Sequence, residues 1–168
     1  MSNLLFSSLH LHGFLSFGPK SEEVKLTNLN VLIGPNGVGK SNFIEAVELL
    51  HATPTDFGGA IRIGGTAGDW MWRGGKGASS AWIGGTLGPI EHMPELRYGI
   101  EFTESGGRLE VVDEVLEEAH KADARKSDVR FYYRFQHGRP AIRVHEVVKN
   151  GTTRTFQQVK LKRETLDP

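Results

Sequence analysis

The sequence predicts an α/β fold with α+β character, in which one buried strand leads through a glycine-rich loop into a helix and antiparallel hairpins surround this unit. Three observations predict it. Residues 29–33, LNVLI, form a short apolar run that is typical of a strand buried on both faces. Residues 43–50 carry apolar side chains at helical spacing. Residues 98–159 show the alternation of half-exposed strands.

The chain before the loop predicts two strands. Residues 9–17 are rich in apolar side chains that alternate with histidines, and residues 18–21, GPKS, predict a turn. Residues 24–26 then form a short return strand that leads toward the apolar run. The helix after the loop is expected to stop at Pro54, because proline cannot continue a helix.

Glycine is concentrated in the middle of the chain. Of 21 glycines in 168 residues, eleven lie between Gly58 and Gly88, together with all three tryptophans. We therefore divide one domain into three parts: strands, loop and first helix over 1–56, a Gly/Trp-rich loop over 57–89, and an antiparallel β subdomain over 90–168.

The β subdomain is predicted from alternation and turn residues. Residues 98–103 and 108–112 form a hairpin around a turn at 104–107, and the charged stretch 114–126 is either a loop or a frayed helix. Further strands are expected at 129–136, 141–148 and 152–159, with turns at His137–Gly138 and Asn150–Gly151.

Composition excludes several classes of protein. Lys plus Arg and Asp plus Glu each number 20, so no net charge attracts nucleic acid, and the absence of cysteine excludes disulfides and thiolate metal sites. The amino terminus lacks the basic region of a signal peptide, and no apolar run reaches membrane-spanning length. We therefore expect a cytoplasmic protein without a membrane partner.

The loop itself carries the chemistry. Gly34, Gly39, Lys40 and Ser41 satisfy the pattern G-x-x-x-x-G-K-[ST] between an apolar strand and a helix. Glycines let backbone N–H groups turn toward phosphate oxygens, and the helix N-terminus adds partial positive charge. Lys40 is expected to contact the β- and γ-phosphates of ATP, and the Ser41 hydroxyl to ligate Mg²⁺. The predicted nucleotide-binding residues are Gly34, Pro35, Asn36, Gly37, Val38, Gly39, Lys40, Ser41 and Asn42.

Residues 12–50, HGFLSFGPKSEEVKLTNLNVLIGPNGVGKSNFIEAVELL, resemble the amino-terminal end of the RecF, SMC and Rad50 class of ABC-type ATPases, and especially the bacterial AAA family ATPases. An aromatic-Ser-Phe turn, G-P-N-G-x-G-K-S-N and an I-x-A helix carry the resemblance. It implies the first lobe of a P-loop ATPase head. It also implies ATP and Mg²⁺ as cofactors, and the rest of the head or a second head as partner across ATP.

The other motifs of such a head are imitated by one stretch, ESGGRLEVVDE. Residues 105–107 resemble a signature sequence and residues 111–114 a Walker B strand. Only five residues separate Gly107 from Asp113, which leaves about 17 Å of strand and no room for a signature helix. We therefore predict a hairpin turn and a half-exposed strand, and find no catalytic residue. Gln157 and Gln158 are weak candidates for the Q-loop of the class.

A possible DNA contact lies at "WRGGKG", where Arg73 and Lys76 flank glycines and resemble the R-G-G turn of SMC heads. A solvated loop that covers the tryptophans is the competing interpretation. The seven histidines lack the H-x-x-x-H spacing of a zinc site, and we expect them at the surface or in the core.

Three functions follow from these features. The leading one is the ATP-binding part of a RecF/SMC-like ATPase that couples ATP to DNA repair or to an effector, such as a nuclease partner, in anti-phage defence. The second is a nucleotide-binding interaction module without hydrolysis, and the third is a small P-loop kinase, which the lack of an arginine-rich lid disfavours. Because a helical lobe follows such β-strands in this class, we expect an incomplete lobe that binds nucleotide without hydrolysing it alone.

Overall fold

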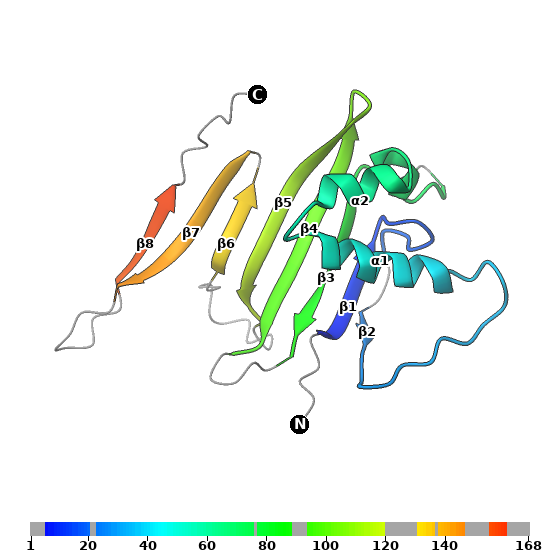
Figure 1. The fold of residues 1–168 in the computed structure, drawn as a ribbon, viewed down its shortest axis with the longest axis horizontal. Coiled ribbons are helices and arrows are strands. Elements are labelled where there is room, and N and C mark those ends of the chain that lie inside the picture. Colours follow the sequence, from blue (N-terminus) through cyan, green and yellow to red (C-terminus); the bar gives the residue numbers. More distant parts are fainter. Residues whose placement is uncertain are drawn as a thin grey trace.

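The computed structural model describes residues 6–20, 23–75, 77–88, 94–119, 131–136, 138–146 and 155–160. In these parts of the chain the backbone forms one sheet of eight strands, two helices and a short 3-10 helix (Figure 1). Among the described residues, no helix has the length and apolar character needed to cross a membrane. The elements in chain order are β1 Phe6–His12, β2 Val24–Lys25, α1 Lys40–Ala52, α2 Phe57–Ile63, η1 Ala67–Trp70, β3 Ala81–Leu87, β4 Leu96–Ser105, β5 Arg108–Glu118, β6 Phe131–Gln136, β7 Arg139–Glu146 and β8 Thr155–Lys160.

Every pair of neighbouring strands in the sheet is antiparallel, and the order is β2-β1-β3-β4-β5-β6-β7-β8. From β3 onward each strand therefore lies beside its neighbour in the chain, as hairpins require. Both helices lie on one face of the sheet over β1, β3 and β4, whereas β6 to β8 extend away from them (Figure 1). The antiparallel hairpins that the alternation predicted are confirmed.

The core lies between the helices and the first strands of the sheet. Alternate side chains of three strands are buried there, because successive side chains of a strand point to opposite faces. They are Leu9 and Leu11 of β1, Ala81 and Ile83 of β3, and Ile100 and Phe102 of β4. Helix α1 covers these strands with apolar side chains three and four positions apart, and α2 and η1 add to the same layer. The buried cluster includes Leu9, Leu11, Phe43, Ala46, Leu49, Leu50, Phe57, Ile61, Trp70, Ile83, Ile100 and Phe102.

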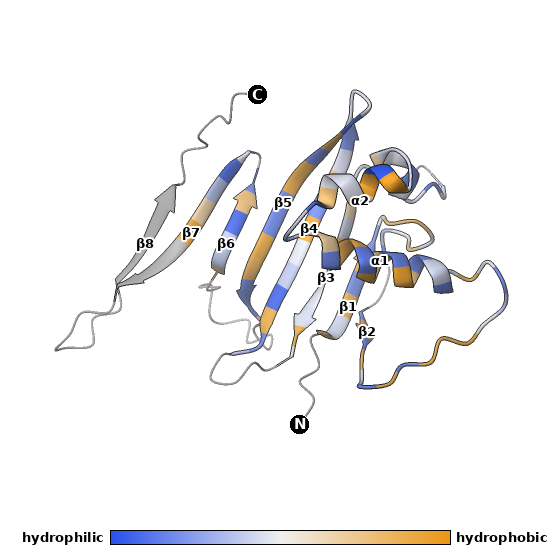
Figure 2. Ribbon diagram, viewed as in Figure 1, coloured by the Kyte–Doolittle hydropathy of each residue, from blue (hydrophilic) through white to orange (hydrophobic). Residues whose placement is uncertain are grey.

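The strand predicted at residues 29–33 does not form, and this prediction is wrong. The segment runs as part of a long loop between β2 and α1 that swings away from the sheet, with apolar residues along it (Figures 1 and 2). Leu29 is 81% exposed, Val31 70% and Ile33 89%. A strand buried on both faces needs a hydrogen-bonded neighbour and two covering layers. No described strand pairs with this segment.

The polar residues before this segment adopt a local turn instead. The Thr27 backbone N–H donates to Asn30 Oδ1 at 2.9 Å, and the Asn30 side-chain amide donates to the Thr27 carbonyl at 2.7 Å. Such side chain–backbone bonds compete with sheet pairing and are favoured where no partner strand is present. The short return strand is confirmed as β2, and the Leu26 N–H extends it by donating to the Ser7 carbonyl.

The interpretation of residues 57–89 as a loop is also wrong, since α2, η1 and β3 lie within it. Asp56 caps α2 by accepting a hydrogen bond from the Gly59 N–H at 2.7 Å. The strand β3 needs glycine at positions 84 and 85, because a Cβ on either residue would overlap the backbone of a neighbouring strand. In β3 the weak hydrophobic periodicity of the sequence therefore reflects glycines that allow close packing of strands, not a loop.

The remaining strands lie near their predicted positions. The turn at 104–107 is confirmed, and Gly106 and Gly107 have φ angles of 59° and 76°, which glycine adopts at little cost. The charged stretch after Asp113 does not form a loop or helix at its start, because β5 continues to Glu118. Residues 120–126, His137 and the Asn150–Gly151 turn lie outside the described residues.

Candidate functional site

The loop from Gly34 to Gly39 leads directly into α1, which begins at Lys40. Gly37 and Gly39 have φ angles of 82° and 99°, in the left-handed region that favours glycine. Gly39 is the N-cap of α1, no side chain caps the helix, and its first turn holds no acidic residue. The first N–H groups of a helix have no partner within it, so this end of α1 offers donors and partial positive charge to an anion.

Lys40 lies over this loop. Its Nζ donates hydrogen bonds to the carbonyls of Gly34 and Pro35, both at 2.8 Å. The ammonium is therefore held against the loop whose amides form the anion cradle. A phosphate oxygen in the cradle is a charged acceptor, and it forms a stronger hydrogen bond with the ammonium than a carbonyl does.

The residues present fit a magnesium–nucleotide complex. Ser41 lies in the first turn of α1, next to Lys40, and a Cβ built on Gly37 meets no atom within 4 Å. In the described residues no cluster of three His, Cys, Asp or Glu side chains is arranged to hold a metal ion. Mg²⁺ is commonly bound by one or two protein oxygens, water and the phosphates of its nucleotide, and Ser41 would provide such an oxygen here.

A neighbour that the sequence did not predict touches the loop. The hydroxyl oxygen of Ser16, in the turn between β1 and β2, lies where a Cβ on Gly39 would be. Ser16 belongs to the aromatic-Ser-Phe turn that contributes to the family resemblance, and this is the one sequence signal for its role. The spacing of residues in the sequence does not predict that residue 16 contacts residue 39. The contact arises from the packing of β1 under α1.

The stretch resembling signature and Walker B sequences is a hairpin, as its length predicted. Ser105 ends β4, Gly106 and Gly107 form the β4–β5 turn, and residues 111–114 lie in β5, between β4 and β6. Asp113 pairs with Arg134 at 2.5 Å. Glu114 accepts hydrogen bonds from the hydroxyls of Tyr98 at 2.7 Å and Tyr133 at 3.3 Å. Both acidic residues therefore have structural partners.

Glu114 also lies far from the phosphate loop. Its partner Tyr98 hydrogen-bonds Thr53, which is the C-cap of α1. Helix α1 has 13 residues, so its ends are about 20 Å apart. The carboxylate is at the opposite end of the helix from Lys40 and Ser41 and cannot orient a water at a phosphate bound there.

Arg73 is engaged within the fold. Its guanidinium pairs with Asp69 and also donates to the Gly68 carbonyl. Hydrogen bonds from the Thr66 backbone N–H and hydroxyl, with Arg73 added, lower the pKa of the Asp69 carboxyl. Lys76 lies outside the described residues, and so do the side chains of Gln157 and Gln158. The structure thus gives Arg73 a local partner and brings no second described cation beside it for DNA.

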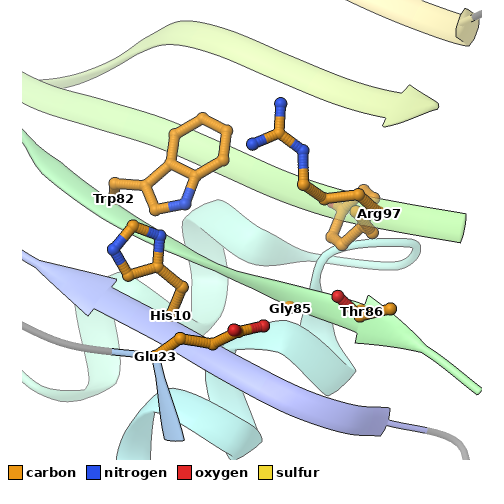
Figure 3. A pocket seen from close by; sticks show the side chains of 7 residues that line it. His10, Glu23, Trp82, Gly85, Thr86 and Arg97 are labelled. Atoms are coloured by element: carbon orange, nitrogen blue, oxygen red, sulfur yellow. The ribbon is translucent and has the colours of Figure 1, made fainter. Parts of the chain in front are cut away.

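A separate pocket of about 300 Å³ lies on the sheet face away from the helices, lined by His10, Glu23, Trp82, Gly85, Thr86, Arg97 and Tyr98 (Figure 3). Its charged side chains have partners in the fold. Glu23 accepts hydrogen bonds from Lys25 and then Ser8, and these lower the pKa of its carboxyl group. Arg97 pairs with the buried Glu117. Burial, and then His10, lower the pKa of neighbouring His12. The rings of His10 and His12 are 5.4 Å apart on the same face of β1, as the alternation of residues 9–17 predicted.

Comparison with known families agrees with the loop geometry. A family model described as "AAA domain, putative AbiEii toxin, Type IV TA system" matches residues 29–160, most of the chain. The chain belongs to this AAA domain family. The match begins at the apolar run before the phosphate loop and ends at β8, so it includes the hairpins. Comparison with curated proteins and with solved structures finds no match.

Family membership has direct consequences for this AAA domain. It identifies a P-loop nucleotide-binding fold of the ATPase type, and AAA ATPases in general bind ATP with Mg²⁺. The prediction of an AAA-type ATP-binding chain is thereby confirmed at the level of the family.

The Tyr98–Glu114 contact makes the free energy of unfolding depend on pH in the alkaline range. Burial, and then Glu114, raise the pKa of the Tyr98 hydroxyl, and the same two causes raise the pKa of Tyr133 to about 12. An unfolded phenol has a pKa near 10. Above that pH the unfolded chain releases protons that the folded chain retains, so the free energy of unfolding falls as pH rises.

Tyr98→Phe should therefore lower the free energy of unfolding by about 1–2 kcal/mol at pH 7, because a hydrogen bond to a carboxylate is lost. The difference from the unsubstituted chain should shrink from about pH 10 upward. Urea denaturation at both pH values measures this. Thr103→Ala, which removes a hydrogen bond to the Ser79 carbonyl without a titrating group, should show a constant difference. A constant difference for Tyr98→Phe as well would contradict the assignment.

Proposed function

We propose that this AAA domain binds ATP or ADP with Mg²⁺ through residues 34–42 and serves as the ATP-binding part of a larger ATPase assembly. The observation that carries the proposal is the position of Lys40 Nζ on the loop carbonyls of Gly34 and Pro35, at the uncapped N-terminus of α1. Backbone amides, a helix terminus and a cation converge there, and this combination suits a chain of phosphates.

Each residue of the loop has a role in this proposal. Amides from Gly37 to Ser41 donate to the phosphate oxygens, and Lys40 exchanges its carbonyl partners for the β- and γ-phosphates. The Ser41 hydroxyl ligates Mg²⁺, which neutralises phosphate charge when bound. Pro35, Asn36, Val38 and Asn42 complete the loop that keeps these groups in position.

The apolar segment 29–33 supports a partner that completes the sheet. Two apolar residues of α1 are exposed as well, Ile44 at 54% and Val47 at 41%. Exposed apolar surface of this kind supports an interaction site. We propose that the rest of an ATPase head, or a second head across ATP, covers them.

The finer assignment follows the sequence motifs. Resemblance of residues 12–50 to RecF, SMC and Rad50 proteins supports an assembly that couples ATP to a DNA transaction or an effector. The family's description as a putative toxin of a type IV TA system supports a role in defence within the same proposal. A nuclease or other effector is then the partner that responds to whether ATP or ADP is bound.

The second candidate, a nucleotide-binding module without hydrolysis by this chain alone, is favoured by the location of Glu114. Its carboxylate is bound by Tyr98 and Tyr133 at the far end of α1. Among the described residues, the first turn of α1, which follows the phosphate loop, holds no acidic side chain. Hydrolysis would need a carboxylate from elsewhere to orient water.

Lys40→Ala should weaken binding of Mg·ATP and Mg·ADP about 10-fold or more, because a charge-assisted contact to phosphate is lost. Isothermal titration calorimetry measures the affinity. Lys25→Ala removes the same charge from an exposed lysine that pairs with Glu23, and it should leave the affinity unchanged. Equal affinity in the Lys40→Ala and Lys25→Ala proteins would reject the nucleotide site.

The chain described here should release phosphate from ATP no faster than the Lys40→Ala variant. Loss of a positioned base and of charge stabilisation each costs on the order of 10²-fold or more in rate. A phosphate-release assay tests this, with Glu114→Gln as the informative variant. Turnover near roughly 1 s⁻¹ that disappears in Glu114→Gln would mean that residues 111–114 act as a Walker B strand.

A further inference from the structure

The turn between β1 and β2 lies against the start of α1. A Cβ built on Gly39 would overlap the hydroxyl oxygen of Ser16, and the ring of Phe17 lies 6.4 Å from that of Phe43 in the first turn of the helix. Two segments 23 positions apart in the sequence, residues 16 and 39, thus share one small surface. That surface is the edge of the phosphate loop.

The turn is held rigidly in this position. The N–H of Phe14 donates to the Phe17 carbonyl at 3.0 Å, and the N–H of Phe17 returns a bond to the Phe14 carbonyl at 2.7 Å. The Leu15 N–H donates to the Trp70 carbonyl at 2.9 Å, which ties the turn to η1. Preorganised groups bind a ligand without a further ordering cost.

Leu15 has a φ angle of 46°, in the left-handed region that a leucine rarely adopts. In the described part of the chain it is the only residue other than glycine with positive φ. Such strain persists where the surrounding structure enforces it, and it is concentrated at functional sites. Here the strained residue directly precedes Ser16 and sets the direction in which the chain presents it.

The Ser16 hydroxyl has no hydrogen-bond partner among the described residues, and the residue is exposed. A serine could cap α1, yet the helix has no side-chain cap. Its oxygen nevertheless lies in contact with Gly39, the residue directly before Lys40.

We infer that Ser16 is a nucleotide-binding residue, whose hydroxyl donates a hydrogen bond to a phosphate oxygen of the nucleotide held by residues 34–42. This inference rests on the proposed function of that loop. The amides around Gly39 converge on the phosphates, so a hydroxyl in contact with Gly39 lies at the border of the same cradle. The β1–β2 turn then forms a second wall of the site, in addition to the loop and α1.

Ser16→Ala tests the inference. It should weaken the affinity for Mg·ATP, Mg·ADP and magnesium pyrophosphate about 10-fold each, as the loss of a hydrogen bond to a charged group does. Ser16→Thr keeps a hydroxyl and should retain most of the affinity. Ser105→Ala, in the β4–β5 turn, is the matched control and should bind all three ligands like the unsubstituted chain. Calorimetry gives the affinities, and circular dichroism checks that each variant is folded.

The outcomes separate this inference from the function on which it rests. Undiminished binding by Ser16→Ala, together with weakened binding by Lys40→Ala, would overturn the role of Ser16 and leave the nucleotide site intact. Weaker binding of both nucleotides with unchanged pyrophosphate affinity would also overturn it, because the contact would then be to the nucleoside. Absence of nucleotide binding by the unsubstituted chain would overturn both proposals.

Discussion

The packing of α1 on the sheet is the interaction on which the site depends. Phe43, Ala46, Leu49 and Leu50 are buried against β1, β3 and their neighbours, and this contact fixes where the helix begins. Fully burying a phenylalanine or leucine side chain such as Phe43, Leu49 or Leu50 contributes about 1.5–3 kcal/mol. Because the helix cannot slide without exposing them, its N-terminus, Lys40 and Ser41 stay beside the β1–β2 turn. The N-terminal end of α1 is thus positioned by the apolar packing of the helix on the sheet.

The same helix also leaves apolar side chains exposed to water. An α-helix that is apolar on two sides is usually buried on both, and Ile44 and Val47 of α1 are exposed. The apolar segment 29–33 has the same character. An apolar strand is stabilised mainly by burial of both its faces, so it gains little stability from pairing at a sheet edge where water covers those faces. The chain forms the Thr27–Asn30 turn instead.

Local signals predicted what depends on local chemistry. The loop glycines were expected to let the backbone bend, a helix was expected after the loop, and residues 104–107 were expected to turn a hairpin. Gly37 and Gly39 have positive φ angles, α1 follows the loop, and Gly106 and Gly107 form the turn. What failed depends on distant contacts. Gly84 and Gly85 lie in a strand where the backbones of neighbouring strands approach closely. Ile33 is exposed because no described strand pairs with its segment. Neither is encoded in a short window, and the contact of Ser16 with Gly39 is of the same kind.

The central claim is that a formed phosphate loop and helix follow an apolar segment that has no partner among the described strands. Hydrogen–deuterium exchange of the backbone amides tests it most directly. We expect the amides of residues 31–33 to exchange at rates close to those of an unstructured chain, while those of Ile83 and Ile100, in paired central strands, stay protected. Adding Mg·ATP should slow exchange in residues 37–41 and leave residues 31–33 fast. Protection of residues 31–33 equal to that of Ile83 would contradict the account, because it would require a strand partner already present.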